Sequence, residues 1–165
     1  MGSNHSKNKI NYEDVQDACK CKYNNARNEN AQDACKYNTR NEKRYIIINT
    51  MDKNWQSCLI QNTISIQEEE ETINGILNNK CANSNANDIT VIVYGTNSND
   101  ESIYLKHEQL VKLGIKNAFI YTGGMFEWLL LQDIYGRDLF PTTSRELDIL
   151  KYKPRKQINV LYIGT

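Results

Sequence analysis

Apolar and polar positions follow one another along the chain in a pattern that predicts a strand, a loop and a helix near its centre. Thr90–Tyr94 is a β-branched and aromatic run, which is typical of a strand buried within a parallel sheet. Polar residues follow at once, and Ser98 with Glu101 three positions later fits a capping box that begins a helix. Apolar residues then recur at helical spacing until Gly114, where we expect the helix to end.

Similar patterns continue on both sides of this unit. Downstream we expect a strand over Asn117–Tyr121 and an apolar helix over Met125–Ile134. Upstream we expect strands over Tyr45–Asn49 and Thr63–Ile66, and a helix with an acidic start over Gln67–Leu77. Strands and helices that alternate in this way predict an α/β fold with a mainly parallel sheet.

Two further elements are expected beyond Gly136. Thr143 and Glu146 fit a second capping box, which predicts a helix over Glu146–Tyr152. Ile158–Ile163 has the pattern of a strand, and we expect it to fill a vacant edge of the sheet. The alternative is that it is an exposed peptide that pairs with a partner by strand addition.

Residues 1–43 predict a different kind of segment. They are polar and contain an imperfect duplication, Gln16–Lys20 and Gln32–Lys36, with hardly any aliphatic residues. Burial of so little apolar surface does not offset the loss of chain entropy. We therefore expect a disordered or loosely helical arm over residues 1–43 and a folded domain over residues 44–165.

The order of these elements resembles the second half of a rhodanese domain. The resemblance is carried by the strand ending at Tyr94, the loop behind it, the strand ending at Tyr121, and the turn Gly123-Gly124 followed by Trp128. The upstream strands are similar to the first half of that family, so the match covers about residues 44–136. It implies a rhodanese-like three-layer α/β sandwich, with a mainly parallel central sheet flanked by helices, as in the related cell-division-cycle phosphatases.

The same resemblance places the active-site loop directly after the central strand, where the nucleophile is missing. In active rhodaneses that position is a cysteine that carries a persulfide, whereas here it is Gly95 and no thiol or arginine follows in the loop. Asp100 and Glu101 at the helix start would repel a bound thiosulfate or phosphate. The candidate site is therefore a degenerate loop without a catalytic residue, formed by Gly95, Thr96, Asn97, Ser98, Asn99, Asp100, Glu101 and Ser102.

Other residues do not replace the missing nucleophile. Asn49 and Met51 stand where an Asp and an Arg usually brace the loop in this family. Cys58 and Cys81 do not match the family's nucleophile position, and we interpret them as structural or idle thiols. His107 lies on the apolar stripe of its helix, which favours a packing role over a catalytic one.

The composition and charge of the chain limit the partners, location and cofactors that we expect. The chain has 165 residues with 20 basic and 20 acidic side chains, so its charge gives no reason to expect nucleic acid as a partner. It contains no apolar run of about eighteen residues and no signal-peptide core, from which we expect a cytoplasmic protein with reduced thiols. We expect no cofactor and no metal, because Cys19, Cys21 and Cys35 with His5 lack the paired C-x-x-C spacing of a zinc site.

The start of the chain fits the acceptor pattern for N-myristoylation of Gly2, although a chance match or a cloning scar would give the same residues. A single myristoyl chain binds membranes only marginally, so stable attachment requires a second signal. We expect Cys19 and Cys21, which lie in a segment expected to be flexible, to supply that signal by S-palmitoylation. The protein would then divide between the cytoplasm and a membrane surface.

Two hypotheses for the function remain. The first is a non-catalytic rhodanese-fold module that binds a protein partner or has a regulatory role, which Gly95 and the acidic loop favour. The second is a sulfurtransferase or phosphatase-like enzyme that uses a cysteine from outside the loop, supplied by Cys19, Cys21 or Cys35 or by another subunit. Turnover of thiosulfate that disappears when one of these cysteines is mutated would favour the second hypothesis.

Overall fold

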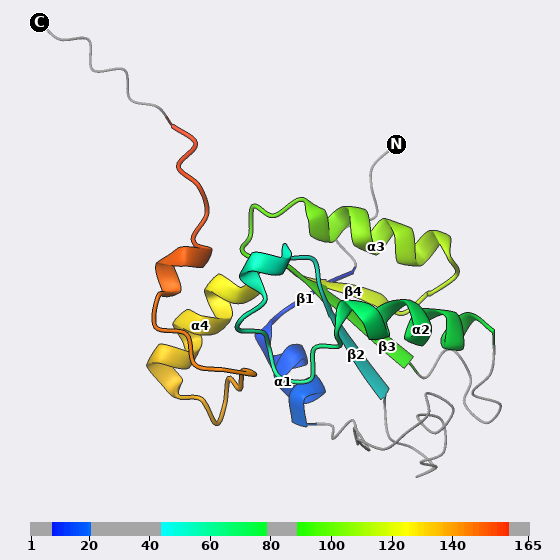
Figure 1. Ribbon diagram of the computed structural model, residues 1–165, viewed down its shortest axis with the longest axis horizontal. Helices are drawn as coiled ribbons and strands as arrows, with labels where there is room; N and C mark the ends of the chain where they lie inside the picture. The colour runs from blue at the N-terminus through cyan, green and yellow to red at the C-terminus, as the bar shows by residue number, and fades with distance from the viewer. Residues whose placement is uncertain (1–7, 21–43, 79–88, 159–165) are drawn as a thin grey trace, which may run out of the picture.

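The computed structural model describes residues 8–20, 44–78 and 89–158, which fold around one parallel sheet (Figure 1). The strands lie in the order β1 (Lys9–Ile10), β4 (Ala118–Tyr121), β3 (Ile89–Tyr94) and β2 (Arg44–Asn49). Helices α1 (Tyr12–Lys20) and α4 (Gly124–Tyr135) pack on one face of the sheet. Helices α2 (Ile66–Leu77) and α3 (Ser102–Lys112) pack on the other face, so the fold has three layers.

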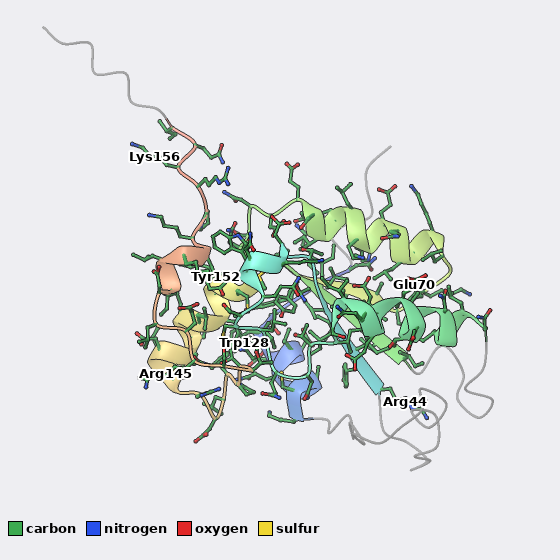
Figure 2. The ribbon with its side chains drawn as sticks, viewed as in Figure 1. Arg44, Glu70, Trp128, Arg145, Tyr152 and Lys156 are labelled. Atoms are coloured by element: carbon green, nitrogen blue, oxygen red, sulfur yellow. The ribbon has the colours of Figure 1, made fainter. Side chains whose placement is uncertain are left out.

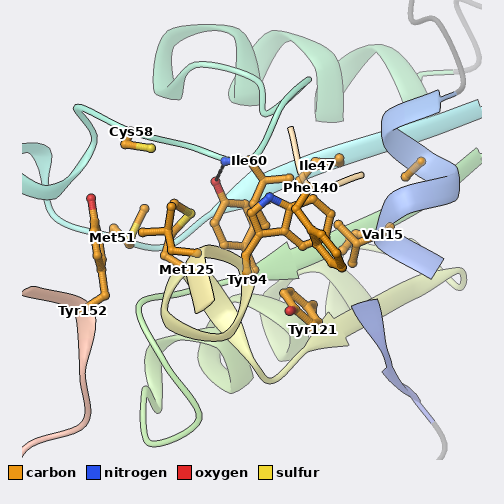
Figure 3. Packing of buried hydrophobic residues seen from close by; sticks show 14 residues of the cluster. Val15, Ile47, Met51, Cys58, Ile60, Tyr94, Tyr121, Met125, Phe140 and Tyr152 are labelled. Atoms are coloured by element: carbon orange, nitrogen blue, oxygen red, sulfur yellow. Dashed lines mark hydrogen bonds between the residues drawn. The ribbon is translucent and has the colours of Figure 1, made fainter. Parts of the chain in front are cut away.

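The central position of β3 explains its unbroken apolar sequence. Arg44–Asn49 of β2 lie in register with Ile89–Tyr94, and β4 pairs with the other side of β3. Because helices cover both faces, each residue from Val91 to Tyr94 is at most 1% exposed. The Tyr94 hydroxyl accepts a hydrogen bond from the Ile60 N–H at 3.2 Å, which leaves this polar group satisfied inside the core (Figure 3).

Residues 9–20 correct our expectation of a disordered or loosely helical arm, because they belong to the sheet and the core. They form β1, which pairs in parallel with β4, and α1, which buries Val15 and Ala18 in the core. The side chain of Asn11 accepts hydrogen bonds from the N–H groups of Glu13 and Asp14 at 3.0 and 3.3 Å and so caps the helix. The polar arm thus supplies the edge strand and first helix of the fold, while residues 21–43 lie outside the described part of the chain.

The expected strand over Thr63–Ile66 is also wrong in its extent. Only Thr63 bridges to β2, through Ile47, and Ile66 already begins α2. Ser65 caps that helix, since its side chain accepts a hydrogen bond from the Glu68 N–H while the Glu68 side chain accepts one from the Ser65 N–H. The acidic start of the helix therefore has the capping role that its position indicates.

The segment after α4 differs from the expected helix over Glu146–Tyr152. The chain bends at Thr143 and Ser144, has no regular secondary structure over residues 145–148, and ends in a short 3-10 helix, η4 (Ile149–Tyr152). Thr143 does not cap a helix there; its hydroxyl oxygen accepts a hydrogen bond from the Leu59 N–H at 3.0 Å. The segment from Pro141 to Ser144 is thus held by hydrogen bonds with residues 57–61.

We expected Ile158–Ile163 to fill a vacant edge of the sheet. On the β4 side, β1 already occupies the edge position. Ile158 is 75% exposed, and residues 159–163 lie outside the described residues. Among the helices that the structure describes, none has the length and apolar character needed to cross a membrane.

Candidate functional site: a degenerate active-site loop

The loop from Gly95 to Glu101 joins the carboxyl end of β3 to the start of α3, and it packs against the turn that opens α4. The carbonyl oxygens of Gly95 and Thr96 accept hydrogen bonds from the N–H groups of Met125 and Phe126 at 3.0 and 2.9 Å. Gly124 has a φ of +62°, and a Cβ there would lie 2.6 Å from the Gly95 carbonyl oxygen. The Gly-Gly turn is therefore required for this close approach of two backbones.

The carboxylate of Asp100 is the centre of the loop. One of its oxygens accepts hydrogen bonds from the backbone N–H and the hydroxyl of Thr96, at 2.9 and 2.8 Å. The other accepts hydrogen bonds from the backbone N–H and the hydroxyl of Ser102, at 3.1 and 2.5 Å. The expected capping box of Ser98 and Glu101 is thus wrong, because Asp100 supplies the acceptor at the start of α3 and Glu101 makes no capping side-chain bond.

These hydrogen bonds determine the charge of Asp100. Partial burial of the carboxylate raises its pKa, but hydrogen bonds from Ser102 and Thr96 lower it by more, so the pKa lies below its ordinary value. The group is ionised at neutral pH. The loop therefore holds a fixed negative charge of its own beside the amino end of α3, where the helix dipole stabilises an anion.

The carboxylate also fills the space in which the side chain after β3 would lie. A Cβ built on Gly95 would meet an Asp100 carboxylate oxygen at 2.3 Å and the Ile103 Cγ2 at 2.9 Å. Real Cβ atoms do not approach other heavy atoms so closely, so a side chain at position 95 requires the carboxylate to move. The space beside Gly95 is therefore occupied by an internal anion.

The turn from Asn49 to Met51 forms an uncharged arrangement. The Asn49 side-chain oxygen accepts a hydrogen bond from the Met51 N–H at 3.2 Å, and Met51 is 5% exposed within the core. Between them, the Thr50 hydroxyl lies 2.7 Å from the Ser102 hydroxyl and so joins this turn to the start of α3. Packing and neutral hydrogen bonds thus hold this turn.

The segment after α4 lies against the loop, a contact that the sequence did not indicate. The Asn97 side-chain amide donates a hydrogen bond to the Tyr152 carbonyl oxygen at 2.9 Å. Tyr152 is 1% exposed, and its ring meets the ring of Trp55, from the 3-10 turn η2 (Lys53–Trp55), at 5.7 Å and 66°. η4 and η2 lie side by side at this end of the molecule (Figure 1). η4 therefore packs against one side of the loop, and η2 packs against η4.

Both cysteines that the structure describes are poor candidates for a nucleophile. Cys58 is 1% exposed, with its sulfur 3.3 Å from the Ser144 carbonyl oxygen. Cys19 lies in α1, its sulfur 3.5 Å from the Gln61 carbonyl oxygen, and burial raises its pKa to about 12. Cys19 therefore lies in a helix of the fold and not in the flexible segment that we expected. Gly2, Cys21, Cys35 and Cys81 lie outside the described residues.

His107 has the packing role that its place on the apolar stripe indicated. It is 4% exposed, more deeply buried than expected, and its Nε2 lies 2.9 Å from the Ala118 carbonyl oxygen. This contact joins α3 to β4. Its position is determined by the core and not by the loop.

Comparison with known proteins agrees with this architecture. A family model described as a rhodanese-like domain matches residues 29–131, which include β2, β3, β4, the loop and the Gly-Gly turn. The matched range begins after β1 and α1, which nevertheless belong to the same sheet and core. No curated protein and no solved structure gives a significant match. The family model covers more than half of the chain, and the chain therefore belongs to the rhodanese-like domain family.

Proposed function

We propose that this chain is a pseudoenzyme of the rhodanese family, a non-catalytic module that acts by binding a protein partner or in regulation. The observation that carries this proposal is the Asp100 carboxylate, which lies where the side chain of a nucleophile would begin. It also accepts the hydrogen bonds of the loop donors in Thr96 and Ser102 that would otherwise be free for a substrate anion. A thiosulfate or phosphate would meet a fixed negative charge and few free donors.

The alternative is an enzyme that uses a cysteine from outside the loop. Neither described thiol supports it, because Cys58 is buried and the raised pKa of Cys19 keeps that thiol protonated at neutral pH. Cys21 and Cys35, and a thiol from another subunit, still have to be tested by mutation.

A thiosulfate-to-cyanide assay with four proteins tests the proposal. We expect no turnover by the wild type, little by Gly95→Cys, and more by Gly95→Cys with Asp100→Ser, because the second change removes the carboxylate that overlaps the new side chain. Gly75→Cys is a matched control, since a Cβ at Gly75 meets nothing within 4 Å. Wild-type turnover that is lost on mutating Cys21 or Cys35 would refute the proposal and favour the enzyme.

The proposed protein partner is supported by the outer face of α4. This helix is apolar on nearly every side, and Leu130, Ile134 and Tyr135 are 39%, 70% and 61% exposed. The full chain and an Ile134→Ser, Tyr135→Ser variant should therefore differ in the proteins that they capture from the native cell. Identical captured sets would remove this face from the proposal. Ser substitutions at Leu105 and Leu113, which are 69% and 48% exposed on the other side of the sheet, serve as the control.

We further propose a cytoplasmic location, with N-myristoylation of Gly2 as a means of partial membrane attachment. The proposal rests on the acceptor pattern alone. Measurement of the intact mass from a eukaryotic cell tests it, together with fractionation of wild type and Gly2→Ala. An unmodified amino terminus would reject it.

A further inference from the structure

The stretch from Arg145 to Ile158, called the basic segment below, has a charge unlike that of the rest of the chain. It contains five basic residues and two acidic ones, Glu146 and Asp148, which gives a net charge of +3 in a chain whose total is 0. The remaining residues therefore sum to −3. The basic residues are Arg145, Lys151, Lys153, Arg155 and Lys156.

Most of this positive charge is free to meet a partner. Lys151 is held by the protein, with its ammonium 3.5 Å from a Glu146 carboxylate oxygen and 5.5 Å from the centre of the Trp55 ring. By contrast, Lys153, Arg155 and Lys156 are exposed, and none of them has a carboxylate within 4.0 Å among the residues that the structure describes. Lys151 thus neutralises the Glu146 carboxylate, and the cations of Lys153, Arg155 and Lys156 are exposed to solvent.

Exposed apolar side chains are interleaved with these cations. Leu147 and Ile158 are 78% and 75% exposed, the highest values for large hydrophobic residues in the described chain, and Leu150 is 63% exposed. An acidic peptide or a nucleic acid would pair with the cations but leave these three side chains in water. An anionic bilayer takes up both, because its headgroups attract cations and its interface accepts apolar side chains.

The charge distribution gives the protein one orientation on such a surface. α2 carries the four consecutive carboxylates Glu68–Glu71 and lies at the opposite end of the long axis from η4 (Figure 1). Arg145 and Lys156 lie on the η4 side, whereas Glu70 lies on the α2 side (Figure 2). Repulsion of α2 therefore adds to attraction of the basic segment, although the net charge is zero.

From these observations we propose that the basic segment docks the protein on an anionic lipid bilayer, with Lys153, Arg155 and Lys156 at the headgroups and Leu147, Leu150 and Ile158 at the interface. This surface lies at the carboxyl end of the described chain and is separate from the lipidation pattern at Gly2. Its residues differ from those of the outer face of α4, to which we assign a protein partner.

Sedimentation with lipid vesicles tests the electrostatic part. Full-length protein without lipid modification should bind vesicles of phosphatidylcholine with about 30% phosphatidylserine, bind pure phosphatidylcholine far more weakly, and dissociate at high salt. Arg155→Gln with Lys156→Gln should weaken binding by about tenfold or more, since each cation near the surface contributes several-fold. Lys112→Gln with Lys116→Gln removes the same charge from the α3 side and should leave binding unchanged.

A second pair of variants tests the apolar part. Leu147→Ser with Leu150→Ser should weaken binding to the mixed vesicles without changing its salt dependence, whereas Leu105→Ser with Leu113→Ser should not. All variants alter exposed positions, and unchanged thermal unfolding would show that they fold. Absence of binding to the mixed vesicles, equal loss in both charge variants, or binding to polyglutamate but not to vesicles would overturn the proposal.

Discussion

The overlap between position 95 and Asp100 predicts a strong energetic coupling between these two residues. A Cβ at Gly95 would lie 2.3 Å from a carboxylate oxygen and 2.8 Å from the carboxylate carbon of Asp100. Gly95→Ala must therefore displace the carboxylate from hydrogen bonds with Thr96 and Ser102. Overpacking costs about 1–3 kcal/mol and each weakened hydrogen bond about 0.5–1.5 kcal/mol, so we expect Gly95→Ala to destabilise the fold by about 3 kcal/mol.

Removal of the carboxylate should relieve most of this cost. Asp100→Ser alone leaves the N–H groups of Thr96 and Ser102 without their acceptor, and because the site is half-buried and water replaces part of the bonding, we expect a loss of about 1–2 kcal/mol. With Asp100→Ser in place, Gly95→Ala meets only the Ile103 Cγ2 at 2.9 Å, and its cost should fall to about 1 kcal/mol. The destabilisation of the double variant should therefore be smaller than the sum of the two single destabilisations by about 2 kcal/mol.

Urea unfolding of the wild type, the two single variants and the double variant measures this coupling. Gly75→Ala is the control, because a Cβ at Gly75 meets nothing within 4 Å; in the interior of α2 it should stabilise the fold by up to about 1 kcal/mol. If the two single effects add to within about 0.5 kcal/mol of the double variant, position 95 and Asp100 are independent and the assignment of the nucleophile's space to the carboxylate is wrong.

Three further predictions concern the charge of Asp100, the packing of α1 and the thiols. Folding lowers the pKa of Asp100, so the ionised carboxylate stabilises the fold above the ordinary pKa of 3.8, and this stabilisation is lost as the pH falls below that value. The difference in the free energy of unfolding between wild type and Asp100→Asn, measured in urea, should therefore be full at pH 7 and shrink below about pH 4. Val15 is fully buried, so Val15→Ala should cost about 2–3 kcal/mol in the same assay, while the exposed Asp17→Ala should change little; equal effects would mean that α1 is not part of the core. The buried Cys58 should react with iodoacetamide at pH 8 only after unfolding, and the partly buried Cys19, whose pKa is raised, should react slowly in the native protein, as mapped by peptide mass; labelling of native Cys19 as fast as that of the unfolded chain would contradict its raised pKa.

The elements with strong periodic patterns could be predicted from the amino-acid sequence. β2, β3 and β4 are runs of β-branched and aromatic residues, and α2, α3 and α4 repeat apolar residues at helical spacing. Each pattern is complete within its own segment, so no knowledge of distant residues is needed to recognise it. The absence of a thiol at Gly95 is local information of the same kind, once the resemblance gives the position its meaning.

The elements whose stability comes from distant partners could be seen only in the folded structure. Tyr12, Val15, Ala18 and Cys19 lie on one side of α1, but this weakly apolar stripe does not stabilise a nine-residue helix without the core, and β1 exists because β4 offers it an edge. Similarly, η4 is held by a hydrogen bond between Asn97 and Tyr152 that joins residues 55 positions apart. Sequence spacing carries no trace of such contacts.

The role of Asp100 could be predicted from the sequence only in part. Its acidic character and its place before a helix are visible in the sequence, which led us to expect repulsion of a substrate anion. The convergence of donors from Thr96 and Ser102 on its carboxylate, and its overlap with the space beside Gly95, depend on how the loop folds back against the Gly-Gly turn. A residue type can be read from the chain, but the atoms that it meets are determined by the packing of the loop against α4.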